Sequence, residues 1–291
     1  MSSQLAVDPL RLPILLIGLQ RREFSHKLGI CEMLFAKRLS ANGICWVQTA
    51  AGPVWKLDLT NSTHRWIVYG KYEGAAFFDW INRNLPPDPI IVDSGANIGQ
   101  MALYFGTYFP KAHVLAFEPG KYQAGWFSEC LVRNPDLPVQ LFQQALGDCE
   151  QTMYLQLTGH SCSHGGQNTV TEDATGEPIQ VVRLAKVLAS QNINHVDLWK
   201  LDVEGCEIPA LNGARELLET KRIRALWVET IGDNGARIMS FMRDIGYQGF
   251  AFNHRGDAVD VARYMDDNTL FLPEEPANLF SGNVNMLAKQ R

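Results

Sequence analysis

A glycine-containing turn, Asp93-Ser94-Gly95-Ala96-Asn97-Ile98-Gly99, follows a short apolar run and opens a helix-like segment. In an open α/β sheet, ligands bind at this place, beyond the carboxyl ends of the strands. Gly95 can take a backbone φ that other residues adopt only at a cost, and Gly99 allows the helix to pack closely on the sheet. A dinucleotide fingerprint would need glycines at positions 97 and 100, where this sequence has Asn97 and Gln100. The turn is therefore poorly suited to a pyrophosphate.

Carboxylates follow three successive predicted strands. Asp93 would repel a phosphate but would attract an ammonium or sulfonium group. Glu118 stands 23 residues after Gly95, about the spacing at which an acidic side chain reaches ribose hydroxyls. Asp148 is placed to accept a hydrogen bond from an adenine amino group. Together these residues predict a site for S-adenosylmethionine, although singly they could cap a helix, end a strand and form a turn.

A second charged cluster lies in the segment from Lys200 to Glu207. Its strand borders the point where the sheet order is expected to reverse, so its carboxyl end should face the reactive methyl group. Methyl transfer to an alcohol needs an in-line approach and a base. Asp202, Glu204 and Glu207 are candidate bases, and Lys200 could pair with them or orient the acceptor. Alternatively, Glu204 and Glu207 only complement the dipole of the following helix.

Three further residues are candidates for contacting the acceptor. Glu229 ends the predicted fifth strand, and His160 and His164 lie in a long polar loop over residues 159–177. Asp202 and Glu229 also occupy places from which Mg²⁺ could be held, since this ion prefers oxygen ligands. Two carboxylates alone are weak evidence for a metal site, so no metal is expected. The histidines could add a base or a ligand, although such loops are more often surface segments.

Several motifs resemble the FkbM family of S-adenosylmethionine-dependent methyltransferases over residues 66–252. The matching segments are Gly70-Lys71-Tyr72-Glu73, the Asp93–Gly99 turn, Phe117-Glu118-Pro119, Ala145-Leu146-Gly147-Asp148, Lys200–Glu207, Leu211 and Gly213-Ala214. Ser94 departs from the usual Val or Ile, and Gly147 from a small polar residue. The resemblance implies a class I methyltransferase fold and O-methylation, often of sugars or secondary-metabolite hydroxyls, with S-adenosylhomocysteine as product. The cofactor contacts it supports are Tyr72, Glu73, Asp93, Gly95, Asn97, Ile98, Gly99, Glu118, Pro119, Ala145, Asp148 and Asp202.

Composition excludes several other classes of protein. The 291 residues are 46% hydrophobic and 20% charged, with a net charge of −5, which is typical of a folded domain without affinity for nucleic acid or anionic membranes. The six cysteines form no CxxC pair, which favours reduced thiols in a cytoplasmic protein. The apolar run near the start is too short to span a bilayer, and acidic and proline residues precede it. We therefore expect neither export nor a membrane span.

The chain is expected to fold as an N-terminal α+β extension, residues 1–85, and a methyltransferase domain, residues 86–291. The proline-rich segment at residues 85–89 sets this boundary, because proline fixes φ and lacks an amide donor. Beyond it, short apolar runs alternate with helical patterns, which predicts a doubly wound, mostly parallel seven-stranded sheet. The expected strands are Ile90–Val92, His113–Phe117, Val139–Gln143, Val196–Leu201, Ala225–Glu229, Tyr247–Phe252 and either Thr269–Leu272 or Val284–Leu287. The expected helices are Ile98–Phe109, Tyr122–Asn134, Leu184–Gln191, Ile208–Thr220 and Ala236–Ile245.

The extension is expected to hold a helix over Phe24–Leu39 and strands over Ile44–Val47 and Val54–Leu59, and another strand is expected over Thr152–Leu157. The extension could act as a lid or form a homodimer contact. The function predicted for the whole chain is methylation of a hydroxyl on a small-molecule acceptor. Two alternatives remain at this point: a methyltransferase-like binding protein without turnover, and an NAD-dependent oxidoreductase, which Asn97 and Gln100 disfavour.

Overall fold

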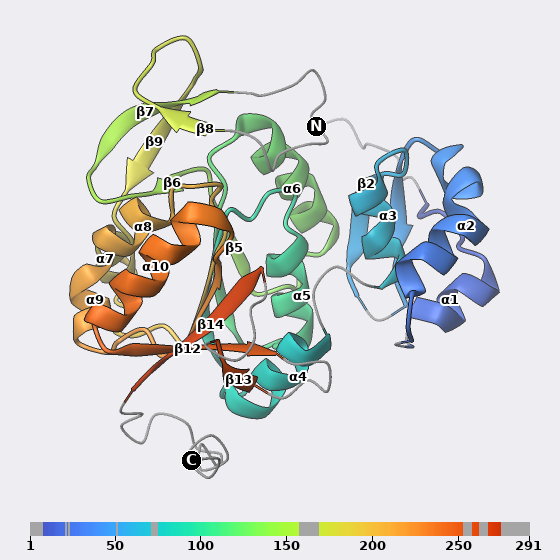
Figure 1. The fold of residues 1–291 in the computed structure, drawn as a ribbon. Coiled ribbons are helices and arrows are strands. Elements are labelled where there is room, and N and C mark those ends of the chain that lie inside the picture. Colours follow the sequence, from blue (N-terminus) through green and yellow to red (C-terminus); the bar gives the residue numbers. More distant parts are fainter. Residues whose placement is uncertain are drawn as a thin grey trace.

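Figure 1 shows the computed structural model, which describes residues 8–20, 22, 24–50, 52–70, 75–156, 169–252, 258–261 and 267–274. Within these residues the chain forms an eight-stranded sheet, a four-stranded sheet and a two-stranded sheet. The N-terminal helices and the two-stranded sheet lie to one side of the large sheet in the view of Figure 1.

The large sheet is mostly parallel, as the sequence predicts. Five adjacent strands from β5 to β11 run parallel, and β14 is antiparallel to both of its neighbours. The described residues give eight strands instead of the expected seven, because the short β13 pairs with the outer edge of β12. In spatial order the strands are β13 (Ala258–Asp260), β12 (Tyr247–Phe252), β14 (Asn268–Pro273), β11 (Leu226–Glu229), β10 (Leu198–Leu201), β3 (Ile90–Ser94), β4 (His113–Phe117) and β5 (Val139–Phe142).

The strand order reverses between β3 and β10. From β3 the chain builds β4 and β5 on one side, and it later adds β10 and β11 on the other. Ser94 at the end of β3 is in register with Leu201 on one neighbour and Phe117 on the other. The carboxyl ends of three strands therefore finish level at the place where open α/β sheets bind ligands.

Helices cover both faces of the large sheet, which buries the apolar central strands on both sides. One apolar core includes side chains of α4 (Ala75–Asn84), α5 (Gln100–Tyr108) and α6 (Lys121–Arg133). The other core includes side chains of α7 (Leu184–Ser190), α8 (Glu207–Gly213), α9 (Arg215–Glu219) and α10 (Gly232–Asp244).

Most of the predicted core elements are confirmed to within a few residues. The expected helix Ile208–Thr220 is wrong in one respect, because it is divided into α8 and α9 at Ala214, whose φ of −112° and ψ of 9° are not helical. The late strand is the Thr269–Leu272 candidate, now β14, whereas Val284–Leu287 lies outside the described residues.

A four-stranded sheet forms within the segment between β5 and α7. It consists of β6 (Ala145–Leu146), β9 (Glu177–Val182), β7 (Gln151–Gln156) and β8 (Thr169–Thr171), in that order. The strand expected over Thr152–Leu157 is confirmed as β7. The loop expected over residues 159–177 is wrong in its second half, because β8 pairs with β7 and Glu177 opens β9. Residues 157–168 lie outside the described part of the chain.

The N-terminal region contains α1 (Ile14–Gln20), α2 (Lys27–Ser40), β1 (Ile44–Gln48), β2 (Val54–Asp58) and α3 (Ser62–Tyr69). The expected helix and both expected strands are confirmed, whereas α1 and α3 were not predicted. Hydrogen bonds fasten β2 to α6: the Trp126 indole donates to the Lys56 carbonyl at 2.6 Å, and Asn134 exchanges two hydrogen bonds of 2.8 Å with the Val54 backbone. Within the expected extension, α4 packs on the large sheet, where Phe77 stacks on Trp227 with ring centroids 4.6 Å apart.

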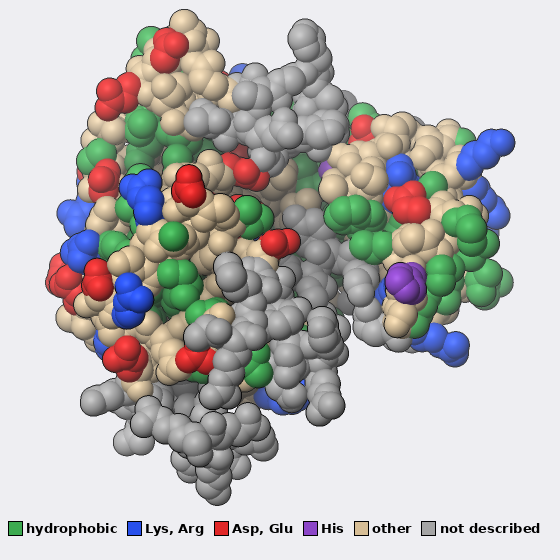
Figure 2. Space-filling model, viewed as in Figure 1, with side chains coloured by type: hydrophobic (Ala, Val, Ile, Leu, Met, Phe, Trp, Pro, Cys, Tyr) green, Lys and Arg blue, Asp and Glu red, His purple; other side chains and the backbone are tan. Residues whose placement is uncertain are grey.

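The outer faces of α1 and α2 carry exposed apolar side chains, among them Ile14 and Met33, which are 88% and 78% exposed. Figure 2 shows hydrophobic side chains gathered on this part of the surface with Lys and Arg around them. Of the helices in the described segments, none combines the length and the hydrophobicity needed to cross a membrane.

Candidate methyl-transfer site

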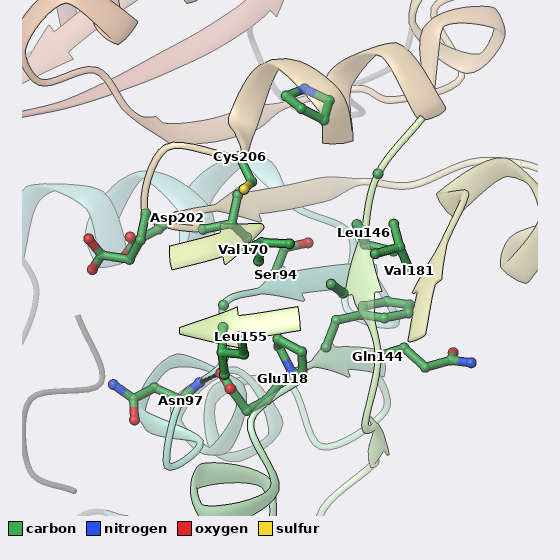
Figure 3. A pocket seen from close by; sticks show the side chains of 18 of the residues that line it. Ser94, Asn97, Glu118, Gln144, Leu146, Leu155, Val170, Val181, Asp202 and Cys206 are labelled. Carbon is green, nitrogen blue, oxygen red and sulfur yellow. Dashed lines mark hydrogen bonds between the residues drawn. The ribbon is translucent and has the colours of Figure 1, made fainter. Parts of the chain in front are cut away.

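A cavity of about 480 Å³ opens at the carboxyl ends of β3, β4 and β10. Figure 3 shows Asn97 and Asp202 on one side of it and Gln144 and Val181 on the other, with Glu118 between them. The walls come from the turn after β3, the end of β4, the β6 segment and the loop after β10. The four-stranded sheet and the N-terminal region complete the walls.

The turn after β3 fits tightly against the loop after β10. Gly95 has a φ of +75°, and a β-carbon there would lie 1.8 Å from the Asp202 carbonyl oxygen. Any other residue would push the two loops apart. The amides of Gly95 and Ala96 both donate to the Phe117 carbonyl at 3.0 Å, which ties the turn to β4 as well. The sequence predicts that glycine is needed at position 95, and the close contact with Asp202 gives the steric reason.

Glu118 joins the β3 turn to the next helix through its carboxylate. Its Oε2 accepts a 2.9 Å hydrogen bond from the Asn97 amide, and its Oε1 accepts one of 2.8 Å from the Gly120 amide. Burial raises the pKa of Glu118 to about 7, although both backbone hydrogen bonds act in the opposite direction. Each oxygen keeps a second lone pair, so the carboxylate can still accept hydrogen bonds from a ligand in the cavity.

Asp93 lies behind the turn. It is fully buried, does not line the cavity, and has an oxygen 3.6 Å from the Lys200 ammonium. Burial raises the pKa of Asp93, and Lys200 opposes that rise. The Lys200 ammonium also lies 3.1 Å from Asp202 and donates to the Gly95 carbonyl at 3.3 Å, so it acts as the charge partner of this junction. The unusual Ser94 accepts a buried hydrogen bond of 2.8 Å from the Trp199 indole, a contact that Val or Ile could not make.

The loop after β10 carries carboxylates in two different environments. Glu204 lines the cavity and has a φ of 52°, a left-handed conformation that costs a non-glycine residue roughly 1 kcal/mol. Partial burial and the charges of Asp202 and Glu229 raise the pKa of Glu204 to about 7. Glu207 is 1% exposed and lies outside the cavity lining, because its carboxylate accepts hydrogen bonds from the loop backbone.

Glu229 ends β11 and is not part of the cavity lining. Burial, followed by the charges of Asp202 and Glu207, raises its pKa to about 7. Asp202, Glu204 and Glu229 therefore form one acidic area, in which Asp202 and Glu204 line the cavity and Glu229 lies beside it. Within the described residues, no three His, Cys, Asp or Glu side chains are grouped as a metal site would require.

The predicted site residues fall into three groups. Those that line the cavity are Gly95, Asn97, Glu118, Pro119, Ala145, Asp148, Asp202 and Glu204. Those that lie behind or beside it are Asp93, Ile98, Gly99, Lys200, Glu207 and Glu229. Tyr72, Glu73, His160 and His164 lie outside the described residues. Ile98 is a core residue, and Gly99 faces the Phe127 ring of α6, where a β-carbon would lie 2.3 Å from the ring.

Sequence reasoning missed two walls of the cavity. The four-stranded sheet contributes Met153, Leu155, Val170 and Val181. The only signal for them was the alternating pattern of the predicted strand at Thr152–Leu157. The second wall is the segment 61–63, at the start of α3, where Asn61 accepts a 3.0 Å hydrogen bond from the Thr63 amide as the helix cap. Asn61 is a residue type that often starts a helix, but nothing in the sequence marks this segment as part of a cavity.

The sequence of this chain matches a known protein family. The model of the methyltransferase FkbM domain matches residues 93–248, which is more than half of the chain. The chain belongs to the FkbM methyltransferase domain family. The family match begins at β3 and ends in β12, so it includes both loops that meet at Gly95 and Asp202.

Individual members of the family are moderately similar to this chain in sequence. Methyltransferase sdnD from Sordaria araneosa is 32% identical over 196 residues, which are 56% of this chain and 75% of the relative. The 31-O-demethyl-FK506 methyltransferase FkbM from Streptomyces tacrolimicus is 28% identical over 193 residues, which are 56% and 74% of the two chains. Among solved structures, precorrin-6y C5,15-methyltransferase from Geobacter metallireducens is 11% identical with a TM-score of 0.40, over 67% of this chain and 84% of the other.

Proposed function

We propose that this FkbM methyltransferase uses S-adenosylmethionine to methylate a hydroxyl oxygen of a small-molecule acceptor, with Glu204 as the base. The observation that carries the proposal is the cavity at the level ends of β3, β4 and β10, lined by Glu118 at its centre and by Glu204 at the loop after β10. The name of the Streptomyces relative, a 31-O-demethyl-FK506 methyltransferase, supports oxygen as the accepting atom.

The chemistry of the cavity walls fits S-adenosylmethionine. Glu118 can accept hydrogen bonds from ribose hydroxyls while it keeps its two backbone donors. Leu146 and Val181 offer an apolar surface for the adenine ring, and Asp148 is an acceptor for its amino group. The acidic area around Asp202 suits the cationic methionyl end. When bound, S-adenosylmethionine supplies an electrophilic methyl group on a sulfonium.

The side chain of Glu204 can accept the proton of the acceptor. A pKa of about 7 makes its carboxylate a stronger base than an ordinary glutamate, yet leaves it ionised in mildly alkaline solution. As the acceptor oxygen gains the methyl group, its proton passes to Glu204 and S-adenosylhomocysteine is the second product. Residues 61–63 and the strands β7 and β8 close the remaining sides, and they are the candidate walls for choosing the acceptor.

Calorimetry with S-adenosylmethionine, S-adenosylhomocysteine and NAD tests the cofactor. We expect the first two to bind below the millimolar range. Binding of NAD without binding of either adenosyl compound would reject the proposal in favour of an oxidoreductase. A panel of hydroxylated sugars and polyketide alcohols, assayed by formation of S-adenosylhomocysteine, then separates a working enzyme from a binding protein without turnover.

The role of Glu204 is tested with Glu204→Gln and the acceptor that this panel identifies. The amide keeps the shape of the side chain but cannot take the proton, so single-turnover transfer should fall by roughly 10²- to 10⁴-fold while cofactor affinity stays the same. Glu216→Gln, on the exposed face of α9, is the matched control and should leave the rate unchanged. A Glu204→Gln rate within threefold of the unsubstituted protein at every pH would refute the role as base.

A further inference from the structure

The loop between β10 and α8 is held from behind by Glu207. Its Oε1 accepts two backbone hydrogen bonds, one of 3.0 Å from Val203 and one of 3.2 Å from Gly205. Glu207 is 1% exposed, so these hydrogen bonds are shielded from water. A single buried oxygen therefore fixes two amides that stand on either side of Glu204.

This arrangement determines the backbone conformation of Glu204. Glu204 and Gly205 have φ values of 52° and 94°, so two successive residues are left-handed. If Glu204 adopted an ordinary φ, the amides of Val203 and Gly205 could no longer point at the same oxygen. The left-handed turn is what carries the Glu204 side chain to the cavity wall.

The second oxygen of Glu207 reaches another loop. Its Oε2 accepts a hydrogen bond from the side-chain amide of Asn234, in the first turn of α10. α10 follows β11, which ends at Glu229. The Glu207–Asn234 contact thus links the loop that carries Glu204 to the segment that follows Glu229, whose charge contributes to the raised pKa of Glu204.

We propose that Glu207 and Asn234 form a positioning clamp that holds the Glu204 side chain at the cavity. Neither residue is a base in this proposal, since both oxygens of Glu207 are engaged and Glu207 does not line the cavity. The proposal rests on the proposed function in that the clamp serves Glu204 as the base. Its physical content, which is the conformation of Glu204, can be measured without any acceptor.

Two substitutions of Glu207 separate the clamp from simple removal of charge. Glu207→Gln and Glu207→Ala both remove one negative charge near Glu204. Only Glu207→Gln keeps an oxygen that can accept from Val203 and Gly205, and its amide can donate to Asn234 if the Asn234 amide turns over. The probe is the full chain saturated with S-adenosylhomocysteine, followed by amide hydrogen exchange at residues 203 and 205 and by carbon-13 titration of the Glu204 carboxyl.

We expect Glu207→Ala to accelerate exchange of both amides at least tenfold, and Glu207→Gln to stay within threefold of the unsubstituted protein. The titration midpoint of Glu204 should be lower in Glu207→Ala than in Glu207→Gln by one pH unit or more, because the released side chain becomes more exposed to water and also moves away from Asp202 and Glu229. Equal exchange rates and equal midpoints in the two variants would overturn the clamp.

A milder pair of variants covers the case in which Glu207→Ala does not fold. Asn234→Ala leaves Glu207 in place but removes the donor to its second oxygen, so exchange at residues 203 and 205 should rise at least threefold. Asp233→Ala, at the neighbouring exposed position of α10, is the control and should not change it. No change with Asn234→Ala would restrict the clamp to Glu207 and reject the part assigned to Asn234.

The exchange result does not depend on catalysis, so failure of Glu204→Gln to slow methyl transfer would reject the base but not the clamp.

Discussion

Glu118 organises the site at the level of a single residue, because its carboxylate holds the β3 turn and faces the cavity at the same time. We expect Glu118→Ala to weaken binding of S-adenosylhomocysteine at least tenfold, since charge-assisted hydrogen bonds to ribose hydroxyls are worth roughly 1.5 to 3 kcal/mol each. Glu150→Ala, an exposed acid near the rim of the four-stranded sheet, serves as control. An unchanged dissociation constant in a folded Glu118→Ala protein would place the ribose elsewhere.

The raised pKa of Glu118 gives cofactor binding a specific pH dependence. Burial holds this pKa at about 7 in the free protein, whereas hydroxyl donors favour the ionised carboxylate. Binding should therefore release a proton near pH 6, and affinity should increase as the pH rises from 6 to 8. Calorimetry in two buffers of different ionisation enthalpy measures the proton release. The same release in Glu118→Gln would assign it to another group.

Base catalysis by Glu204 predicts a rate that follows its ionisation. With a pKa of about 7, single-turnover methyl transfer should rise close to tenfold per pH unit below 7 and level off above pH 8. Glu204→Gln should remove this dependence together with most of the rate. A steep profile that persists in Glu204→Gln would point to a different titrating group.

At the scale of elements, α8 packs directly on the turn that carries Asp148. A β-carbon at Gly213 would lie 1.9 Å from the Gly147 carbonyl oxygen and 3.4 Å from the Asp148 α-carbon. Gly213→Ala should therefore separate α8 from this turn, with a loss of at least about 2 kcal/mol in unfolding free energy and weaker cofactor binding. Gly125→Ala in α6, where nothing lies within 4 Å of the added carbon, is the control. It should raise stability by up to about 1 kcal/mol. Denaturant titration measures the unfolding free energy of both variants. If Gly213→Ala were as stable as the unsubstituted protein, α8 could move away from the turn without cost, and the prediction would be wrong.

The elements that the sequence predicts well are those with a strong local pattern. The central strands are apolar runs bounded by turn residues, and the acids at their ends are placed by the strand geometry itself. The strands β6 and β8 are two and three residues long and form through pairing with distant partners, so no local pattern marks them. The sequence also does not predict that Glu204 lines the cavity while Glu207 does not. This difference depends on a left-handed turn, which forms only in the folded loop.

At the scale of the whole molecule, the cavity is closed by parts that are far apart in the sequence. Segment 61–63 comes from the N-terminal region, which is fastened to α6 through Trp126 and Asn134. The four-stranded sheet comes from the segment before α7, and the family match does not extend to residues 61–63. The wall at residues 61–63, a candidate for choosing the acceptor, therefore lies outside the segment that matches the family.

The buried acids of the site should also shape the stability of the whole protein. The pKa of Glu118 is about 7 when folded and near 4.5 for an ordinary glutamate, so the unfolded chain binds fewer protons between these pH values. Stability from this group is thus fully present below pH 4.5 and is lost as the pH rises through 7. The loss is on the order of 3 kcal/mol for a fully buried group. His64, whose pKa burial lowers from 6.5 to about 4, acts in the opposite direction, because folding loses stability as the pH falls below 6.5.

Comparison of two proteins isolates the contribution of Glu118 from that of His64. Urea unfolding at pH 5 and pH 8 gives the change in unfolding free energy between these pH values for the unsubstituted chain and for Glu118→Gln. Both proteins contain His64, so its contribution cancels when the two changes are subtracted. We expect Glu118→Gln to be less stable overall, yet to lose roughly 2 to 3 kcal/mol less between pH 5 and pH 8 than the unsubstituted chain does. Parallel pH profiles would mean that Glu118 is already ionised near its ordinary pKa in the folded protein. In that case the proton release predicted on cofactor binding should be absent as well, so the two measurements check each other.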